Sequence, residues 1–436
     1  MTSPTSDTLD LTAALVDFAT GEVTASPLAQ RMVRLSTLDW IACGIAGVDE
    51  PVSGVLRAQA ISEGGAAQAT IFGGGQVPAR MAALVNGATS HALDYDDTHF
   101  AHIGHPAVAV FPAAFALGQQ LGASLPQLLE AALVGMELSI RVGLWLGRSH
   151  YQQGFHQTAT AGAFGATAAA GRLLQLTPHQ MAMALGLCAT RAAGLKAQFG
   201  TMGKPYNAGL AASAGVEVSS LVAMGLTANA QALDAALGFG ATHHGEANLD
   251  LALQGLGQTW LFDGISHKFH ACCHGLHAAL EATATLDLAA PEIAHLVVRT
   301  HPRWMTVCNQ LAPTSGLGAK FSYRTVLAMQ ALGLDTAALD SYSAATCALP
   351  ELIALRDRIE IEPDEALAET EAHVLALRRD GKRFEARHDL QLPISPDQRE
   401  ARLLGKVAAL IGTDRQATLW QGLQTGVPLA EITDQF

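Results

Sequence analysis

The sequence predicts a mainly α protein with a large all-helical domain and a smaller α+β domain. Apolar residues recur at i, i+3 and i+4 from about residue 8 to 260, which is the period of an amphipathic helix. After about residue 260, β-branched and alternating runs are interspersed with helical stretches, as in an α+β unit. We therefore expect an all-helical domain over 8–260 and an α+β domain over 261–394. The segment 395–436 is helical again and is expected to return to the first domain.

Several segments of the first part are helix candidates, and some begin with a recognisable start signal. Ser26-Pro27, Ser124-Leu125-Pro126 and Thr177-Pro178 place a capping hydroxyl just before a proline, which suits the first positions of a helix. The candidates, in chain order, cover 11–20, 27–47, 78–95, 125–147 and 177–195. The glycine run in 71–80 lacks the lysine and hydroxyl residue of a phosphate-binding loop, so it predicts a turn.

The α+β part is predicted from its strand signals. The run 295–302 is β-branched, and 356–363 alternates charged and apolar residues. The stretch 373–390 has Asp380-Gly381 between two strand-like halves, which is a strong hairpin signal. Helices are expected from near Ala271 and in the segments 322–333 and 395–412.

The composition favours closely packed helices and excludes some classes of partner. Hydrophobic residues make up 49% of the chain and charged residues 15%, against roughly 25% charged in an average soluble protein. Alanine and the 42 glycines let helices approach closely, and part of the surface is expected to be buried against another subunit. The net charge of −13 argues against nucleic acid and anionic membrane as partners.

The sequence also predicts where the protein is found. Apolar runs such as 158–174 are rich in alanine and glycine and carry a charge, so no membrane span is expected. The N-terminal residues have no basic stretch before an apolar core, so no secretory signal is expected. We therefore expect a cytoplasmic protein whose six cysteines are reduced thiols.

The segment 90–106 concentrates groups that suit acid–base chemistry. It holds carboxylates and histidines at Asp94, Asp96, Asp97, His99, His102 and His105. Two interpretations stay open from the residues alone. Either the carboxylates cap helix ends beside an exposed histidine loop, or a carboxylate and a histidine point into a cleft as base and acid. A magnesium–diphosphate site is disfavoured, because Asp96-Asp97 has no third aspartate at the required spacing.

Two further segments each offer one basic side chain. His156 opens an Ala/Gly-rich helix in 154–160, where backbone N–H groups favour anions, although a lone histidine there is usually structural. Lys204 lies in 199–209 among glycines and apolar residues, in a chain with few lysines. This lysine binds a carboxylate, acts as a base after desolvation, or is an exposed loop lysine.

The segment 267–277, HKFHACCHGLH, combines four histidines, two cysteines and one lysine. On a helix, Cys273 and His277 would stand four residues apart on one face, a spacing that could hold zinc. Lys268 would put a positive charge beside that metal, and no C-x-x-C or H-E-x-x-H pattern organises the ligands. A lysine before a helix start, flanked by imidazoles, suits a polycarboxylate better. We therefore expect no metal here and assign packing roles to the cysteines.

Blocks along most of the chain resemble the MmgE/PrpD family, in the order expected of it. They are VNGATSHALDYDDTH (85–99), GHPAVAVFPAAFALG (104–118), GFHQTATAGAFGA (154–166), FGTMGKP (199–205), KFHACCHGLHAALEA (268–282) and GAKFS (318–322). The resemblance covers roughly 8–390. It implies a large all-helical domain with a smaller α+β domain, usually in a homodimer. It also implies an active site between the domains that needs no obligatory metal or organic cofactor.

The resemblance implies site residues at positions that match the family's motifs. The catalytic set, from the motifs D-x-D-D-[ST], H-P, G-[FW]-H-x-T and F-G-T-M-x-K-P and from the lysine before A-C-C, is Asp94, His105, His156, Lys204 and Lys268. The substrate-binding pair is Thr98 in the first motif and His277 in the A-C-C block. The lysines would clamp carboxylates and developing negative charge, and one histidine would be the base and the other the acid. Asp94 would orient a histidine or take the proton itself.

The family includes 2-methylcitrate dehydratase, cis-aconitate decarboxylase and iminodisuccinate epimerase, which all work next to a carboxylate or an equivalent electron sink. We therefore expect a cofactor-independent lyase that acts on a small di- or tricarboxylate. An epimerase or isomerase of an iminodisuccinate-like dicarboxylate is the alternative. Thr325 stands where the dehydratases and decarboxylases commonly have a tyrosine, and Tyr323 is shifted by two positions. A non-catalytic carboxylate-binding protein is disfavoured, because both lysines and both histidines are present.

Overall fold

The computed structural model describes residues 10–436, which divide into two compact units. The first unit comprises the described residues up to His267 together with Ile411–Phe436. The second unit is Lys268–Leu410. Most of the helix predicted at 395–412 therefore groups with the second unit, and only the residues from Ile411 onwards group with the first.

The first unit is helical apart from one very short hairpin. Its helices are α1 (Leu11–Thr20), α2 (Pro27–Ala46), α3 (Pro51–Glu63), α4 (Ala79–His91), α5 (Ala107–Leu121), α6 (Leu125–Gln152), α7 (Gln157–Leu173), α8 (Pro178–Arg191), α9 (Gly203–Ala223), α10 (Phe239–Thr242), α11 (Leu249–Leu253), α19 (Thr413–Thr425) and α20 (Leu429–Thr433). Strands β1 (Ala69–Thr70) and β2 (Gln76–Val77) pair across Gly73–Gly75, whose φ angles are all positive. The predicted glycine turn is thereby confirmed.

The predicted helix starts are confirmed by their caps. The Ser26 side chain accepts a hydrogen bond from the Ala29 N–H at the start of α2. Ser124 and Thr177 each form a capping box, α6 and α8 beginning at the next residue. The helix predicted over 78–95 ends earlier, at His91, because the chain turns back on itself at Asp94, where φ is +52°.

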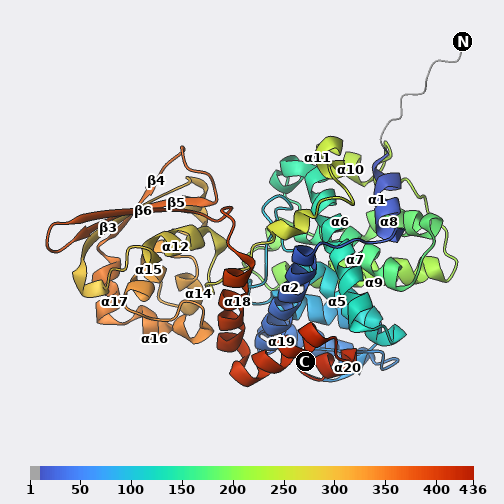
Figure 1. Ribbon diagram of the computed structural model, residues 1–436, viewed down its shortest axis with the longest axis horizontal. Helices are drawn as coiled ribbons and strands as arrows, with labels where there is room; N and C mark the ends of the chain where they lie inside the picture. Colours follow the sequence, from blue (N-terminus) through green and yellow to red (C-terminus); the bar gives the residue numbers. More distant parts are fainter. Residues whose placement is uncertain (1–9) are drawn as a thin grey trace, which may run out of the picture. The chain divides into compact units, whose positions relative to one another are not determined.

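The core of the first unit is built around α7, which is buried along nearly its whole length (Figure 1). It packs against α5, α6, α8 and α9, and α4 packs against α9. Small residues let these helices come close. A Cβ added at Gly87 of α4 would lie only 2.8 Å from the Cα of Gly209 in α9. The end of α4, the start of α7 and the start of α9 each carry a residue of the candidate site described below.

The second unit is a four-stranded sheet with helices on one side of it (Figure 1). Its strand order is β4-β3-β5-β6, for β3 (Ile293–Thr300), β4 (Ile359–Pro363), β5 (Glu371–Arg378) and β6 (Arg383–Asp389). β3 and β4 are parallel and the other pairs antiparallel. β5 and β6 form the hairpin predicted at Asp380-Gly381, and Gly381 has φ +84°. The helices are α12 (His277–Ala284), α13 (Arg303–Val307), α14 (Gly316–Ala319), α15 (Tyr323–Ala331), α16 (Ala344–Cys347), α17 (Pro350–Arg356) and α18 (Pro396–Ile411).

The helix expected from near Ala271 begins later, and that prediction was wrong. The chain makes a single 3-10 turn at His274–Leu276, and α12 starts at His277. The backbone N–H groups of Ala271 and Cys273 donate instead to the distant carbonyls of Thr336 and Lys320. These long-range hydrogen bonds hold the segment in an irregular conformation that periodicity does not reveal.

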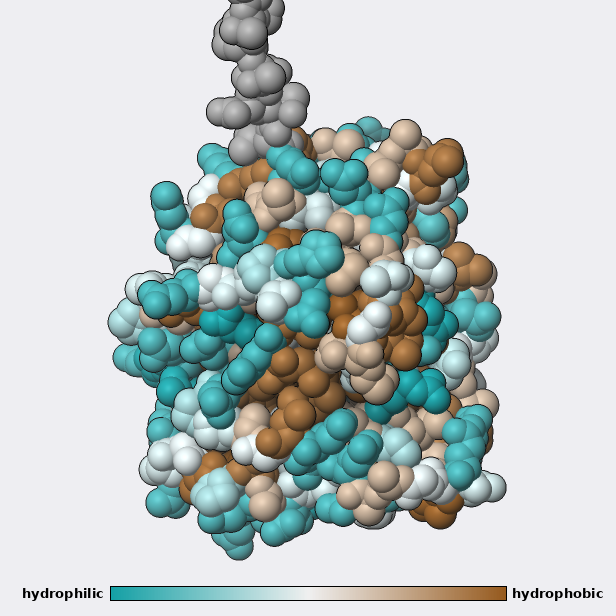
Figure 2. Space-filling view, turned by 90° about the vertical axis from the view of Figure 1, so that its right-hand side faces the viewer, coloured by the Kyte–Doolittle hydropathy of each residue, from teal (hydrophilic) through white to brown (hydrophobic). Residues whose placement is uncertain are grey.

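Apolar surface is present on the first unit. Figure 2 shows the face at the right of Figure 1, where hydrophobic residues gather near the middle among hydrophilic ones. Met224 and Leu237, between α9 and α10, are 77% and 93% exposed. Exposed apolar patches mark interaction sites, but the homodimer stays a prediction. Among residues 10–436, no helix combines the length and hydropathy that crossing a bilayer requires.

Candidate active site

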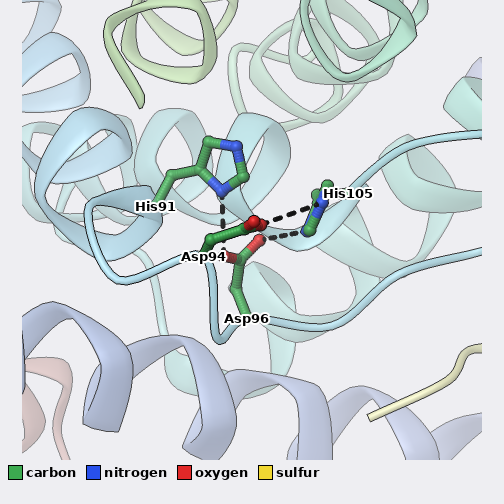
Figure 3. Close-up of side chains that lie close together, drawn as sticks. All are labelled: His91, Asp94, Asp96 and His105. Carbon is green, nitrogen blue, oxygen red and sulfur yellow. Dashed lines mark hydrogen bonds and ion pairs between the residues drawn. The ribbon is translucent and has the colours of Figure 1, made fainter. Parts of the chain in front are cut away.

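The acidic segment between α4 and α5 brings two carboxylates and two imidazoles together (Figure 3). His91 is the last residue of α4, and the turn at Asp94 directs the following residues back toward it. A positive φ in a residue other than glycine costs of order 1–3 kcal/mol and occurs preferentially at functional sites. His105 comes from the end of the same segment, where its N–H donates to the Thr158 hydroxyl of α7.

Asp96 lies at the centre of this cluster and is fully buried. Its Oδ1 accepts a hydrogen bond from His91 Nδ1 at 2.8 Å, and its Oδ2 lies 2.7 Å from His105 Nδ1. Burial by itself raises the pKa of Asp96. The charges of His91 and His105, and hydrogen bonds from both rings, outweigh burial and hold that pKa well below its usual value. Asp96 is therefore an ionised carboxylate between two imidazoles.

Asp94 faces a different group of side chains and is partly exposed. Its Oδ1 lies 2.7 Å from Lys204 Nζ and 3.5 Å from His105 Nε2. Lys204 stands in the first turn of α9, where the helix dipole disfavours a cation, so the Asp94 carboxylate compensates that position. The side chain of Lys204 is only 17% exposed, which contradicts the exposed loop lysine.

Asp97 has a structural role. Its Oδ1 accepts the N–H of Ala107 at 3.4 Å, at the start of α5. Burial, together with the charges of Asp39 and Asp96, raises the pKa of Asp97 well above its usual value. The capping interpretation of this segment therefore holds for Asp97, and the acid–base interpretation suits Asp94, Asp96 and His105.

His99 and His102 are buried neutral residues, so the expectation of an exposed histidine loop was wrong. His99 Nε2 donates to the Leu261 carbonyl at 2.9 Å, and burial lowers the pKa of His99 to about 4. His102 Nε2 lies 2.9 Å from the Ser139 hydroxyl, and burial lowers the pKa of His102 to about 3. Both rings anchor the segment against neighbouring elements.

His156 stands at the N-cap of α7, close to the same cluster. Its ring is stacked at 6.1 Å from His91 and meets Phe199 edge-on at 4.9 Å. Asn207 Nδ2 of α9 donates to His156 Nδ1 at 3.2 Å and also lies 3.3 Å from the Leu195 carbonyl. Burial, with the charges of His91, Lys204 and His105, lowers the pKa of His156 well below its usual value. His156 is therefore a neutral imidazole at neutral pH.

His91, Asp94, Asp96 and His105 bring ligand atoms within 4.8 Å of one another, close enough to test as a metal site. The donor set fits a divalent cation poorly. The Lys204 ammonium already occupies the Asp94 oxygen. The Nδ1 atoms of His91 and His105 face Asp96 and need protons to interact with its carboxylate, so each ring has only Nε2 left as a metal ligand.

Thr98 belongs to the first unit but is held by backbone contacts. Its N–H and hydroxyl both donate to the Ser266 carbonyl, and its own carbonyl accepts the Ser266 N–H. The side chain is largely buried. The predicted substrate-binding role of Thr98 stays a prediction.

Lys268 and His277 lie in the second unit and are both buried. His277 Nε2 donates to the Cys272 carbonyl at 3.3 Å. Burial and the charges of His274, His270 and Lys268 lower the pKa of His277 well below its usual value. Lys268 is thus electrostatically coupled to His277 within this unit, and the predicted roles of both residues stay predictions.

Neither Tyr323 nor Thr325 offers a hydroxyl for chemistry. The Tyr323 hydroxyl donates to the Gly275 carbonyl at 2.6 Å and lies 3.0 Å from the Thr300 hydroxyl. Thr325 is buried in the first turn of α15, with its hydroxyl 2.9 Å from that of Ser322, the N-cap. The shifted tyrosine therefore does not replace a tyrosine at position 325.

The site contains residues that motif reasoning did not assign to it. His91 and Asp96 stand in a quoted block, but the resemblance gave a role only to Asp94 and Thr98 there. Asn207 lies one turn after Lys204 and contacts His156. Lys204 and Asn207 are three residues apart on one helix face, and this spacing is a sequence signal that could have placed Asn207 in the same site as Lys204.

Comparison with known proteins identifies one family over most of the chain. The MmgE/PrpD N-terminal domain matches residues 13–252, and the MmgE/PrpD C-terminal domain matches residues 270–413. The chain is 30% identical to cis-aconitate decarboxylase of Aspergillus terreus (strain NIH 2624 / FGSC A1156) over 320 residues, covering 67% of this chain and 65% of that protein.

Mammalian relatives match over a shorter region. Cis-aconitate decarboxylase of Mus musculus is 32% identical over 231 residues, covering 51% of this chain and 45% of that protein. The Homo sapiens protein of the same name is 31% identical over 224 residues, covering 49% and 46%. The match therefore spans less than two thirds of the length of each of these curated relatives.

Proposed function

The chain belongs to the MmgE/PrpD family, and on this premise we propose that it is a lyase that acts on a small di- or tricarboxylate. The proposed reaction is cofactor-independent and passes through a carbanion next to a carboxylate. The similarity to cis-aconitate decarboxylases supports an unsaturated or hydroxylated polycarboxylate as the substrate class.

One observation carries the proposal: Lys204 and His105 meet at the same oxygen of Asp94. A cation and an imidazole nitrogen thus lie close to one carboxylate oxygen, and the side chain that carries this oxygen is 35% exposed. A substrate carboxylate has the same chemistry as the Asp94 side chain, so it can take the Lys204 ammonium as its own partner. That exchange would bring the carbon next to the bound carboxylate close to the imidazole.

The chemistry follows from these groups. An imidazole removes a proton from the carbon next to the carboxylate, and the electron pair moves onto the carboxylate oxygens. The Lys204 ammonium stabilises the resulting charge, which is the kind of preorganised electrostatic help that dominates many enzymes. The electron pair then expels the hydroxyl group, which takes up a proton from the imidazolium and leaves as water. In a decarboxylation the order differs: carbon dioxide leaves first and the carbanion takes up a proton. The ring centroid of Phe199 lies 5.5 Å from Lys204 Nζ, close enough for a cation–π contact with the ammonium.

An epimerase is the second candidate, and one observation favours it. The hydroxyls of Tyr323 and Thr325 are both engaged inside the second unit, so the tyrosine common in dehydratases and decarboxylases has no counterpart at these positions. Epimerisation needs proton removal and return at one carbon, without a leaving group to protonate. The proposed base, lysine and imidazole donor are the same in both reactions.

The test is proton NMR in D₂O with a panel of di- and tricarboxylates, comparing wild type with Lys204→Ala, His156→Ala and Lys268→Ala. Lys196→Ala is the matched control, because Lys196 donates to the Tyr151 carbonyl and lies over the Tyr151 ring. We expect deuterium to enter next to a carboxylate and a product with loss of water or carbon dioxide. Lys204→Ala should lose at least ~10²-fold in kcat/KM, and Lys196→Ala should stay near wild type.

The other outcomes decide between candidates. Exchange with inversion and no loss of mass would establish the epimerase instead. Binding without exchange or product across the panel would overturn the catalytic proposal. Activity that disappears with EDTA and returns with a divalent cation would contradict cofactor independence.

A further inference from the structure

We infer that Asp96 is the positioning residue of this site. It holds His105 with a proton on Nδ1 and a bare Nε2 toward the substrate, so that His105 is the base and His156 a hydrogen-bond donor. The inference deepens the proposed function, because it assigns the two histidine roles that sequence motifs leave open. The inference depends on the proposed function only for the reaction that the two histidines catalyse. The positions of their protons are argued from the geometry alone.

The two ring nitrogens of His105 face carboxylates of different strength. Nδ1 is 2.7 Å from Asp96, which is fully buried and ionised and lies between the rings of His91 and His105. Nε2 is 3.5 Å from Asp94, which is partly exposed and shares the contacting oxygen with Lys204. A charge interacts more strongly in a buried site than near water, so the proton stays at Nδ1. Nε2 is then the basic nitrogen.

His156 has the opposite arrangement. Its Nδ1 accepts a hydrogen bond from the Asn207 amide, and the orientation of that amide is fixed by the Leu195 carbonyl, which accepts from the same nitrogen. A neutral imidazole with Nδ1 as acceptor carries its proton on Nε2. Because His156 is neutral and has its proton on Nε2, the Nε2–H group can donate a hydrogen bond to a developing oxyanion. A neutral imidazole is only a weak acid. The two histidines therefore present opposite tautomers.

His91 completes the arrangement on the far side of Asp96. It donates to the other carboxylate oxygen at 2.8 Å, so the carboxylate cannot rotate without losing a buried hydrogen bond. When His105 takes a proton, the imidazolium forms directly beside a fixed negative charge. The titratable groups that face His105 are Asp94, Asp96, His91, His102, His156 and Lys204.

The first test reads the tautomers without any substrate. Two-bond ¹H–¹⁵N correlation spectra of the full chain, with histidine ¹⁵N labelling, distinguish a protonated from a bare ring nitrogen. We expect His105 with bare Nε2 and His156 with bare Nδ1, assigned with His105→Gln and His156→Gln. The reverse tautomer at His105 would overturn the inference, whatever substrate the enzyme proves to use.

The second test compares two neighbouring aspartates. Asp96→Asn removes the charge beside Nδ1, whereas Asp97→Asn changes a carboxyl that accepts the Ala107 N–H and whose pKa burial raises well above its usual value. We expect Asp96→Asn to lower kcat about 10²–10⁴-fold with KM changed less than about threefold. Loss of a carboxylate also disfavours the imidazolium, so the acidic limb of the kcat/KM profile should move to lower pH.

The control variant and the possible negative results distinguish a positioning role from structural damage. Asp97→Asn should keep kcat within about threefold and leave the acidic limb in place. Loss of activity in Asp96→Asn without any movement of that limb would indicate structural damage and would contradict the positioning role. If Asp96→Asn does not fold, the ¹H–¹⁵N spectra of the wild type still test the tautomer of His105. If no substrate is turned over at all, the proposed function fails while the tautomer assignment stands or falls by itself.

A second, independent site lies in the second unit, where the sulfurs of Cys273 and Cys308 are 3.0 Å apart. From this distance we propose that the two thiols form a reversible disulfide with a peroxide. The segments that carry them are fixed against each other. A Cβ at Gly275 would come within 2.5 Å of the Trp304 ring, so the chain packs tightly there. Cys273 N–H donates to the Lys320 carbonyl, and Cys308 accepts from the Tyr323 N–H.

The redox step balances as follows. The partly exposed sulfur of Cys273 attacks one peroxide oxygen, the O–O bond breaks, and the departing oxygen leaves as water. The sulfur of Cys308 then attacks Cys273, displaces the second oxygen as water, and an S–S bond forms. Two electrons pass from the sulfurs to the peroxide. The hydrogen bond with Cys273 and burial raise the pKa of the Cys308 thiol, so the partly exposed Cys273 is the sulfur that peroxide reaches first.

The test is intact-mass and peptide mass spectrometry after treatment with stoichiometric hydrogen peroxide. We expect a loss of ~2 Da that dithiothreitol reverses, and a Cys273–Cys308 linked peptide. Cys272→Ser is the matched control and should keep the linkage, whereas Cys308→Ser should abolish it. A gain of oxygen at Cys273 without linkage, or a bridge through Cys272 or between chains, would overturn the proposal.

Discussion

Asp94, Asp96 and Asp97 lie within four residues of one another and experience three different environments. Asp94 is held by Lys204 and solvent, Asp96 by two imidazoles, and Asp97 by the start of α5. The turn at Asp94, where φ is +52°, lets the three side chains face different surroundings. Mutual repulsion, which the sequence suggests, is therefore reduced because each carboxyl has its own partner, and the pKa of Asp97 is raised well above its usual value by burial and by the charges of Asp39 and Asp96.

Tyr323 provides a prediction at the scale of a single residue. Its buried hydroxyl makes hydrogen bonds to the Gly275 carbonyl and the Thr300 hydroxyl, so Tyr323→Phe should lower the free energy of unfolding by about 1–3 kcal/mol. Turnover of the folded enzyme should change less than about threefold. Urea denaturation and steady-state kinetics measure the two effects. A loss of kcat of ~10²-fold at unchanged stability would assign this tyrosine a chemical role and contradict its structural one.

Helix packing places the site, and the crossing of α4 and α9 is its tightest point. His91 lies one turn after Gly87 on α4, and Lys204 lies more than one turn before Gly209 on α9. The absence of a side chain at Gly87 lets the two helices approach closely. The spacing between an imidazole on one helix and an ammonium on the other thus depends on a backbone contact.

The element-scale prediction compares two helical glycines. Gly87→Ala puts a Cβ 2.8 Å from the Gly209 Cα and should destabilise the protein by about 1–3 kcal/mol, with a lower kcat as the site shifts. Gly54→Ala in α3 is the matched control, because a Cβ there has no neighbour within 4 Å. Better helix propensity should make Gly54→Ala more stable by about 0.5–1 kcal/mol. Equal changes of melting temperature in Gly87→Ala and Gly54→Ala would refute the claim that close contact between α4 and α9 requires a glycine at position 87.

The predictability of an element depended on whether its hydrogen bonds are local. The starts of α2, α6 and α8 were predicted correctly because a hydroxyl and a proline next to each other suffice to begin a helix. The segment before α12 was mispredicted, since Ala271 and Cys273 bond to carbonyls far away in the chain. The same limit applies to the site. Motifs indicated Asp94, His105, His156 and Lys204, but only the fold reveals that Asp96 stands between two rings. The predicted domain bounds and the roles of Lys268 and His277 stay predictions.

At the scale of the whole molecule, buried neutral histidines make stability depend on pH. Within residues 10–436, the pKa values of buried histidines are lowered at His99, His102, His150, His156 and His277. In the unfolded chain each would bind a proton below its ordinary pKa near 6.5. Their contribution to stability is therefore complete above that pH and lost as pH falls, by about 1.4 kcal/mol per unit for each ring.

Buried carboxyls act in the opposite sense. Burial raises the pKa of Asp263 to about 6 and also raises the pKa values of Asp97 and Glu137, so these groups favour folding more at lower pH. The imidazoles outnumber them, so we expect the melting temperature to fall between pH 7 and pH 5. Differential scanning calorimetry at constant ionic strength measures this. A melting temperature that rises over the same interval would show that the carboxyls dominate.

The segment after α4 has a consequence for heredity. Codons 94, 96 and 97 are nearly adjacent in the gene, yet the same aspartate-to-asparagine change at each should produce a different phenotype. At 94 it should abolish growth that depends on the enzyme while leaving protein abundance normal. At 96 it should make that growth sensitive to the acidity of the cell. At 97 it should be silent, because the amide oxygen of asparagine can still accept the backbone N–H at the start of α5. Substitutions should therefore be tolerated to different degrees at the three neighbouring codons, although all three encode aspartate.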